Sequence, residues 1–501
     1  MADNLFTRFV AAVPDPQKAF LLPPGASAIS YGDAFARAAQ FAHVLARHGL
    51  VPGDRVAVQT EKSPAALILY LAALRAGLVY LPLNTGYTPS ELAYFVQDAA
   101  PKLFVVAEKN LPAIAAAVPA VEFLTLSDDG QSGSLIAEAQ GAPRNFDDAP
   151  VGMQDLASIL YTSGTTGRSK GAMLSHGNLH SNAASLKQAW GFSANDVLLH
   201  ALPIFHIHGL FVATNVTLLC GASMLFLPKF EPDAIFAALP EATVMMGVPT
   251  FYTRLLKDPR LSPQAAGHMR LFISGSAPLL PETFRDWQAR THHTLLERYG
   301  MTETNMNSSN PYKGERIAGS VGLALPGVEI RIADGEGRPL PQGEIGMIEV
   351  RGPNIFQGYW NMPEKTAAEF RRDGFFITGD MGMIGPDGYL RIVGRGKDLI
   401  ITGGLNVYPR EIEAMLDDVP GVEESAVVGL PHGDFGEGVT AFIIARDGVA
   451  LTEARIQEAL RDRLARFKQP KRVLFLKALP RNTMGKVQKA ALRAEYKDLY
   501  R

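Results

Sequence analysis

The stretch of sequence that decides the fold is Leu160-Tyr-Thr-Ser-Gly-Thr-Thr-Gly-Arg-Ser-Lys-Gly-Ala-Met173. An apolar run, 157–161, leads into a segment of glycines and hydroxyl residues that ends at Lys170. Glycines let several backbone N–H groups point into one concavity, and the hydroxyls and the ammonium add donors for an oligophosphate. The spacing differs from the G-x-x-x-x-G-K-[ST] phosphate loop, and 171–175 is typical of a strand. We therefore expect a strand–loop–strand that binds phosphate, with a flexible polar hairpin as the alternative.

Helix and strand signals alternate on the N-terminal side of this loop. Ser30 can cap a helix that Gly49 ends, and Thr88 can open another helix. A further helix is expected at 64–76, and strands are expected at 55–59, 78–83 and 103–107. Because the connections are short, this alternation predicts a mainly parallel sheet covered by helices. The same alternation resumes from 156 to about 273.

The pattern changes on the C-terminal side. Asp334-Gly335 and Asp387-Gly388 separate short β-rich runs, which predicts antiparallel hairpins over 329–393. The last hundred residues predict a compact α+β unit, with helices near 410–416 and 452–465 and strands near 424–429, 440–446 and 472–476. The short stretch 394–398 is the expected linker. We therefore expect an α/β protein with a large multi-sheet N-terminal domain over 1–396, β-rich at about 320–393, and a small α+β domain over 397–501.

Composition excludes several classes of protein. The 501 residues carry 48 Lys and Arg against 50 Asp and Glu, so we expect no nucleic-acid partner. The segment 197–228 has no acidic or basic residue, but its histidines, prolines and hydroxyls favour a buried core over a membrane span. Cys220 lies in an apolar run and is interpreted as a small buried hydrophobic residue. The first residues lack a signal-peptide pattern, so we expect no membrane partner and a cytoplasmic location.

The motifs resemble those of one superfamily. The segment 161–171 is similar to the signature loop of the acyl-adenylate-forming enzymes, which include acyl-CoA synthetases, adenylation domains of peptide synthetases and luciferases. Five further segments match in the same order, over about Ser30 to Lys486. They are Tyr299-Gly-Met-Thr-Glu-Thr304, Thr378-Gly-Asp380, Gly394-Arg-Gly-Lys-Asp398, Ile401-Thr-Gly-Gly-Leu-Asn406 and Pro480-Arg-Asn-Thr-Met-Gly-Lys486.

The resemblance implies a reaction in which a carboxylate attacks the α-phosphorus of ATP and pyrophosphate leaves. Both reactants are anions, so the chemistry needs charge neutralisation and positioning. ATP, Mg²⁺ and coenzyme A, as co-substrate, are the implied ligands. The implied ATP-binding residues are Thr162, Ser163, Gly164, Thr165, Thr166, Gly167, Lys170, Gly275, Ser276, Ala277, Tyr299, Gly300, Met301, Thr302, Asp380, Arg395 and Lys486. The implied catalytic residues are Lys486, Glu303, Lys170 and His206, with Glu303 and Thr162 near the metal.

The resemblance also implies that the C-terminal domain is mobile. Lys397 matches the hinge position of the superfamily, and rotation there would withdraw Lys486 after adenylation. The same rotation would bring Gly403 and Gly404 to the site, where glycines let the pantetheine arm approach the backbone. Lys486 is expected in an exposed loop, which would make it accessible to acetylation. Acetylation removes the positive charge, so we expect it to switch the enzyme off.

The acid is predicted from the segment 246–254, which borders the acyl pocket in the superfamily. A second carboxylate needs a cation, and Arg254, helped by the Ser276 hydroxyl, is the candidate; a solvent-facing Arg254 is the alternative. His206 is expected to line the acyl site. The sequence offers no third ligand to join His206 and His208, so a zinc site is not expected. The chain is similar to bacterial malonyl-CoA synthetases, which implies malonate and leaves methylmalonate open. The alternatives are a synthetase for another small or aryl acid and a catalytically silent nucleotide-binding homologue.

Overall fold

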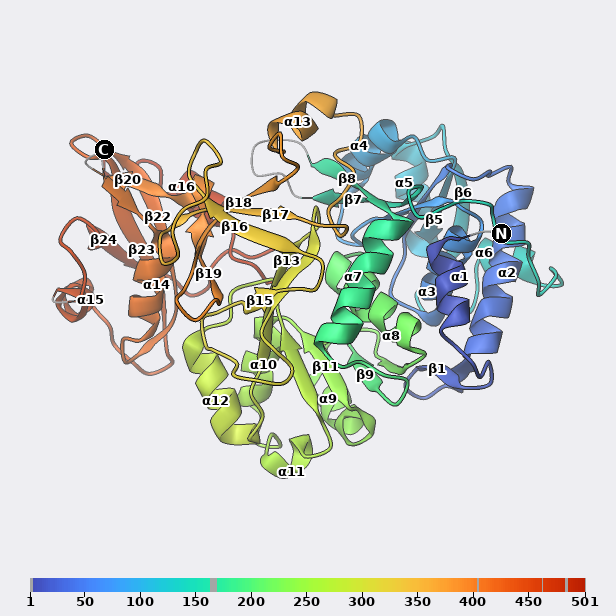
Figure 1. Ribbon diagram of the computed structural model, residues 1–501, viewed down its shortest axis with the longest axis horizontal. Helices are drawn as coiled ribbons and strands as arrows, with labels where there is room; N and C mark the ends of the chain where they lie inside the picture. The colour runs from blue at the N-terminus through green and yellow to red at the C-terminus, as the bar shows by residue number, and fades with distance from the viewer. Residues whose placement is uncertain (1–2, 163–168, 403–404, 462, 483–484, 501) are drawn as a thin grey trace.

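The computed structural model describes residues 3–162, 169–402, 405–461, 463–482 and 485–500. Within these ranges the strands form four sheets, and the chain runs from the N-terminal sheets at one end of the molecule to the C-terminal unit at the other (Figure 1). Large parallel-rich sheets precede an antiparallel sheet and a small α+β unit. The predicted fold class is therefore confirmed.

The first sheet carries the signature loop. Its six strands lie in the order β6-β5-β3-β4-β7-β8, parallel except for the antiparallel pair β7–β8. The strands are β3 (Arg55–Gln59), β4 (Val79–Pro82), β5 (Leu103–Ala107), β6 (Glu122–Leu126), β7 (Leu156–Thr162) and β8 (Lys170–Ser175). The helices of this region are α1 (Leu5–Ala11), α2 (Tyr31–Arg47), α3 (Pro64–Arg75), α4 (Pro89–Ala99), α5 (Leu111–Ala117) and α6 (Ser134–Ala139).

Local signals explain where these helices begin. The Ser30 side chain accepts a hydrogen bond from the Asp33 backbone at the start of α2, and Thr88 and Glu91 form a capping box at the start of α4. Every side chain from 65 to 74 in α3 is buried, so this helix is core on all sides. Its lack of a polar face reflects its place between the sheet and α2.

The second sheet has nine strands in the order β15-β14-β13-β12-β11-β9-β10-β1-β2. Strands β1 and β9–β13 pair in parallel, and antiparallel strands complete both edges. The strands are β1 (Ala19–Leu22), β2 (Ile29–Ser30), β9 (Val197–His200), β10 (Ser223–Phe226), β11 (Val244–Gly247), β12 (Leu271–Ser274), β13 (Leu296–Met301), β14 (Asn305–Ser309) and β15 (Leu323–Ala324). The helices are α7 (His176–Ala189), the π-helix η2 (His208–Thr214), α8 (Asn215–Cys220), α9 (Pro232–Ala238), α10 (Pro249–Leu256), α11 (Pro263–Ala266) and α12 (Pro281–Thr291).

The uncharged segment 197–228 lies in the core of this sheet. It forms β9, the π-helix, α8 and β10, and nearly all of its side chains are buried. Cys220 is buried, and desolvation raises the pKa of its thiol to about 12, which makes it unreactive. No helix among the described residues is both long and apolar enough to cross a membrane.

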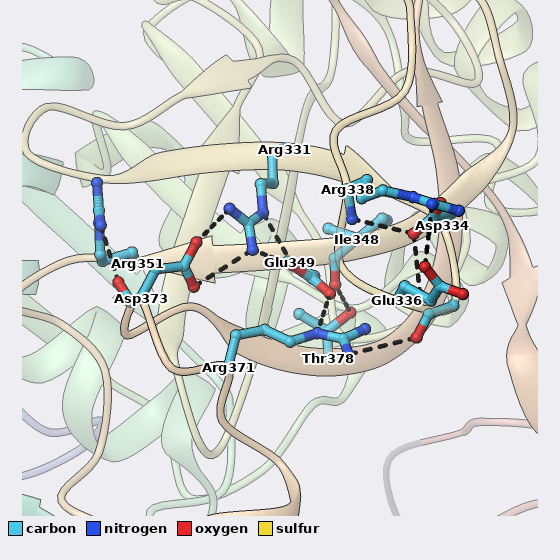
Figure 2. A network of polar contacts seen from close by, with 11 residues as sticks. Arg331, Asp334, Glu336, Arg338, Ile348, Glu349, Arg351, Arg371, Asp373 and Thr378 are labelled. Atoms are coloured by element: carbon cyan, nitrogen blue, oxygen red, sulfur yellow. Dashed lines mark hydrogen bonds and ion pairs between the residues drawn. The ribbon is translucent and has the colours of Figure 1, made fainter.

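The third sheet is antiparallel and contains a buried charge network. It has the order β16-β17-β18-β19, with β16 (Glu329–Ala333), β17 (Gly346–Arg351), β18 (Phe376–Ile384) and β19 (Leu390–Arg395). Glu349 on β17 is fully buried and lies 2.8 Å from Arg331 and 2.7 Å from Arg371, so a guanidinium approaches it from either side (Figure 2). Asp373 extends the network at 2.6 Å from Arg331. A short helix, α13 (Pro363–Ala368), precedes β18.

The C-terminal unit begins after β19. A short helix, η4 (Gly396–Asp398), leads to a sheet of β21-β20-β23-β22 with β24 added beside β23. The elements are β20 (Ile400–Thr402), β21 (Leu405–Val407), α14 (Pro409–Asp417), β22 (Val422–His432), β23 (Gly436–Ala445), α15 (Glu453–Leu460), β24 (Arg472–Phe475) and α16 (Lys489–Glu495). The helix expected at 452–465 ends at Leu460, although Leu464 still packs into the core.

Candidate active site

Thr162 and Lys170 face each other where β7 and β8 meet the signature loop. Lys170 Nζ lies 4.0 Å from the centre of the Tyr359 ring and 3.2 Å from Glu369 Oε1. Both contacts hold the ammonium at the mouth of the loop. The other loop residues predicted to bind phosphate, Ser163, Gly164, Thr165, Thr166 and Gly167, lie outside the described residues.

Glu303 lies in the turn between β13 and β14, close to Lys170. The carboxyl group is buried, and Glu303 Oε1 lies 3.0 Å from Tyr359 Oη. Desolvation raises the pKa of Glu303, while hydrogen bonds and the charges of Lys170 and Arg395 oppose that shift. The turn requires Gly300, because a Cβ there would lie 1.9 Å from the Asn305 carbonyl oxygen.

The surroundings of Glu303 fit a magnesium ion that is bound mainly by substrate. Among the described residues no three acidic, histidine or cysteine side chains converge as a metal site. Mg²⁺ commonly takes one or two carboxylates and completes its coordination with waters and substrate phosphates. Glu303 supplies such a hard oxygen beside the phosphate loop, and the Thr162 hydroxyl is the second candidate.

Asp380 has both carboxylate oxygens engaged. Tyr299 Oη donates to Oδ2 at 2.5 Å, and Arg395 Nε lies 2.6 Å from Oδ1. Asp380 and Arg395 are paired across β18 and β19, while Tyr299 comes from β13. A carboxylate retains acceptor capacity beyond two partners, so ribose hydroxyls can donate to Asp380 as well. The structure thus brings these predicted nucleotide residues together.

Two of the segments predicted to bind ATP follow or end neighbouring parallel strands. Gly275, Ser276 and Ala277 follow β12, and Gly300 and Met301 end β13, with Thr302 in the turn beyond. Ser274 on β12 pairs with Glu297 on β13, so the carboxyl ends of both strands lie at one edge of the sheet. Ligands bind at this edge in open α/β sheets.

Lys486 of the C-terminal unit reaches the same region. Gly485 packs against Thr250 at the start of α10, since a Cβ on it would lie 3.3 Å from that side chain. Desolvation and the positive charge of Arg395 lower the pKa of Lys486 to about 8, although the negative charge of Asp380 opposes the shift. Lys486 is therefore close enough to Asp380 and Arg395 of the N-terminal part for their charges to act on its ammonium. Desolvation also lowers the pKa of Lys397 in η4.

A buried arginine of β13, Arg298, lies against the turn that follows β12. Arg298 is 3% exposed, its Nε has no hydrogen-bond partner, and among the described residues it has no carboxylate partner. Arg298 Nη2 lies 3.5 Å from Ser276 Oγ, and the guanidinium packs on the backbone of Gly275. Desolvation lowers the pKa of Arg298 to about 9, so the group is still a cation at neutral pH.

Two histidines complete this polar cluster. His208 Nδ1 lies 3.2 Å from Ser276 Oγ, and His208 Nε2 is buried without a partner. Desolvation, followed by the charge of Arg298, lowers the pKa of His206 to about 4 and that of His208 well below its usual value. Both imidazoles are therefore neutral. If Ser276 donates to His208 Nδ1, the proton of His208 lies on Nε2 and can be donated to a ligand.

Arg254 does not lie in this cluster. Pro249, Tyr252 and Leu255 form the buried face of α10, and Arg254 lies on the exposed face. The structure brings Arg298, not Arg254, to Ser276. The signal in the sequence was the adjacent charged pair Glu297-Arg298 within β13, where both side chains are buried.

A buried lysine was also missed from the sequence. Lys62 Nζ donates to His200 Nδ1 and to the His200 carbonyl, both at 2.8 Å. His200 Nε2 then donates to the Gly209 carbonyl at 2.9 Å. These bonds connect the first sheet through β9 to the π-helix that begins at His208. π-Helices occur often at functional sites, and this one is anchored beside the histidine cluster.

Comparison with known proteins identifies the class. Residues 8–360 match the AMP-binding enzyme family and residues 411–486 match the AMP-binding enzyme C-terminal domain. The chain belongs to this family.

ATP-bound MatB from Rhodopseudomonas palustris superposes with a TM-score of 0.98 at 58% identity, covering 100% of both chains. A malonate–CoA ligase of Arabidopsis thaliana is 36% identical over 89% of this chain and 78% of its own length. A feruloyl-CoA synthase of an Amycolatopsis species is 35% identical over 94% of this chain and 95% of its own length. Overall identity to the curated relatives therefore does not by itself distinguish between acids.

Proposed function

We propose that the chain is an AMP-forming malonate–CoA ligase, with methylmalonate as a further candidate substrate. The observation that carries the choice of acid is Arg298, a buried cation without a carboxylate partner among the described residues. The second carboxylate of a dicarboxylate supplies a counter-ion to Arg298. An acid with an apolar group at that place leaves the guanidinium without one. The likenesses to MatB and to the plant malonate–CoA ligase support this choice.

In the first half-reaction, a carboxylate oxygen of malonate attacks the α-phosphorus of ATP and pyrophosphate leaves. Lys486 lies near Asp380 and is placed to neutralise both the α-phosphate and the attacking carboxylate. Lys170 binds the terminal phosphates, and Glu303 with Thr162 holds Mg²⁺, which neutralises phosphate charge when bound. Asp380 and Arg395 hold the ribose. No covalent enzyme intermediate is needed, because positioning and charge neutralisation lower the barrier.

The second carboxylate of malonate is held away from the reaction. Arg298 pairs with it, and Ser276 and the neutral His208 add hydrogen bonds. His206 lines the same pocket. Because the imidazoles are neutral, they donate without adding charge, and Arg298 alone sets the charge preference.

In the second half-reaction, the thiol of coenzyme A attacks the malonyl carbonyl and AMP leaves. Rotation about Lys397 withdraws Lys486 and presents Gly403 and Gly404, which lie outside the described residues, to the pantetheine arm. One site then serves both steps. The division of the chain at 396/397 follows from the same proposal.

Two other functions compete with this one. A ligase for an aryl acid is supported by the likeness to feruloyl-CoA synthase, but an aryl monocarboxylate leaves Arg298 unpaired. A catalytically silent nucleotide-binding protein would not need the charged set that is present here. That set comprises Lys170, Glu303, Asp380, Arg395 and Lys486.

The deciding experiment measures AMP and acyl-CoA formed from ATP, Mg²⁺, coenzyme A and a panel of acids. The panel contains malonate, methylmalonate, propionate, acetate, ferulate and benzoate. We expect malonate to give the highest kcat/KM. A higher value for ferulate or acetate would contradict the choice of acid, and the absence of AMP with every acid would support the silent homologue.

Acetylation of Lys486 would remove the positive charge used in the first half-reaction. A sample acetylated only at Lys486 is expected to lose adenylate formation. It should still transfer supplied malonyl-adenylate to coenzyme A. Unchanged adenylate formation would contradict this regulatory proposal.

A further inference from the structure

The carboxylate of Glu369 has three side-chain hydrogen-bond donors around it, close to the phosphate loop. It follows α13, and its Oε1 lies 3.2 Å from Lys170 Nζ and 2.8 Å from Lys365 Nζ. Tyr359 Oη donates to Oε2 at 2.6 Å. Among the described residues, Glu369 is the ion-pair partner of Lys170. The lysine expected to bind phosphate is therefore already paired with a carboxylate of the protein.

Tyr359 connects this pair to Glu303. Its ring lies under the Lys170 ammonium, and its hydroxyl lies 2.6 Å from Glu369 and 3.0 Å from Glu303. A phenol has one proton, so it can donate to only one of the two carboxylates at a time. The shorter contact indicates that Glu369 receives the proton in this arrangement.

Glu369 is an anion at neutral pH. Burial raises the pKa of its carboxyl group, but hydrogen bonds from Lys365 and Tyr359 and the charge of Lys170 hold the pKa below its usual value. Its side chain is 19% exposed, so water screens its charge only in part. A polyphosphate that reaches Lys170 must therefore approach a fixed negative charge.

We propose that Glu369 is a positioning residue that occupies Lys170 when the phosphate site is empty and competes with the phosphates of ATP and pyrophosphate for its ammonium. The inference rests on the proposed function, in which Lys170 binds the terminal phosphates. Binding of ATP exchanges the Glu369–Lys170 pair for a phosphate–Lys170 pair. Departure of pyrophosphate reverses that exchange, so Glu369 weakens the binding of both anions and favours product release.

The proposal predicts that removing the negative charge tightens binding. Glu369→Gln keeps the size and one acceptor oxygen of the side chain but removes the counter-ion of Lys170. We expect the Kd of ATP with Mg²⁺, measured by calorimetry without acid or coenzyme A, to fall about three- to tenfold. The inhibition constant of pyrophosphate against ligation should fall by a similar factor.

Two further variants make the test specific. Glu364→Gln removes the same charge from an exposed residue of α13 and should leave both constants within about twofold of the wild-type values. Glu369→Asp retains the charge and should bind both anions more nearly as the wild type does. Thermal unfolding of each variant shows whether the fold is intact.

Weaker or unchanged ATP and pyrophosphate binding in a folded Glu369→Gln variant would overturn the inference. Equal tightening in Glu364→Gln would also overturn it, because the effect would then be one of net charge. A wild-type protein that binds no ATP would instead contradict the proposed function. The two failures are therefore distinguishable.

Discussion

At the scale of single residues, the acyl side of the site is dominated by an uncompensated charge. Burying a guanidinium without a counter-ion costs several kcal/mol after relaxation. Arg298 carries part of this cost in the ligand-free protein: it has a long contact to Ser276 and an electrostatic attraction to Glu297, but no ion-pair partner among the described residues. A bound carboxylate offsets the cost, and a methyl group in its place does not. Selectivity for a dicarboxylate thus follows from electrostatics more than from pocket size.

Lys486 gives a prediction of pH dependence. Its pKa in the ligand-free protein is about 8, so the ammonium is charged below that value and becomes neutral above it. Under the proposed role, the charged form neutralises the α-phosphate and the carboxylate, so kcat/KM for adenylation should fall as pH rises through about 8. ATP–pyrophosphate exchange measured against pH tests this. A profile that stays flat well above that pH would contradict it.

A substitution separates the role of Lys486 in the two half-reactions. Lys486→Ala should abolish malonate-dependent ATP–pyrophosphate exchange. The same variant should transfer supplied malonyl-adenylate to coenzyme A at a rate close to that of the wild type. Equal loss of both activities would count against the use of one site in two conformations.

The residues of the site differ in how well sequence predicts them. Glu303, Asp380 and Arg395 lie in motifs, and the structure places them near one another. Sequence reasoning points to Arg254 and leaves a solvent-facing Arg254 as the alternative, because the helix face of an arginine cannot be assigned without knowing what packs against α10. Tyr359 and Glu369 come from segments far from the phosphate loop in sequence, so only the folded chain brings them to Lys170.

At the scale of elements, local signals predicted the helices and strands with strong caps or apolar runs. The strands at 55–59 and 103–107 have the predicted bounds, and Ser30 and Thr88 open helices as predicted. Strand order could not be predicted, because pairing is not local. Strand β1 pairs with β10, about two hundred residues later, and no local pattern specifies that contact.

The antiparallel sheet gives a prediction of stability. Glu349 is fully buried between Arg331 and Arg371, so Glu349→Ala leaves two guanidinium groups without their shared partner. We expect a loss of about 3–5 kcal/mol in the free energy of unfolding, measured in urea. Glu329→Ala is the control, because its bridge to Arg351 is solvent-exposed and should contribute little to the free energy of unfolding. Equal losses would contradict the role given to burial.

At the scale of the whole molecule, ion pairs join the C-terminal unit to the N-terminal part. Lys257, after α10, lies 2.7 Å from Glu423 on β22, and Glu282 on α12 lies 2.6 Å from Arg446 after β23. These side chains are largely solvent-exposed, so each pair contributes little and is screened by salt. Weak contacts of this kind are compatible with the proposed rotation of the C-terminal unit.

Loss of these ion pairs should shift the domain arrangement. The double variant Glu282→Gln/Glu423→Gln is expected to lower the population of the arrangement described here by a few-fold. The rate of ATP–pyrophosphate exchange should fall, and the distance between fluorophores on the two domains should change. Added salt should act in the same direction on the wild type.

Glu458→Gln is the control for this variant, because Glu458 pairs with Arg461 inside the C-terminal unit. It should change neither the fluorophore distance nor the exchange rate. The same response from both variants, or no response from the double variant, would show that these pairs do not hold the domain.

The most direct test of the central claim is the selectivity for malonate over propionate, measured as a ratio of kcat/KM values in Arg298→Met and Arg254→Met. Arg298 is buried beside Ser276, and Arg254 lies on the exposed face of α10. The Arg298 variant should lose about 2–5 kcal/mol of selectivity, and the Arg254 variant should keep the wild-type ratio. Loss of selectivity in Arg254→Met, or an unchanged ratio in Arg298→Met, would contradict the account.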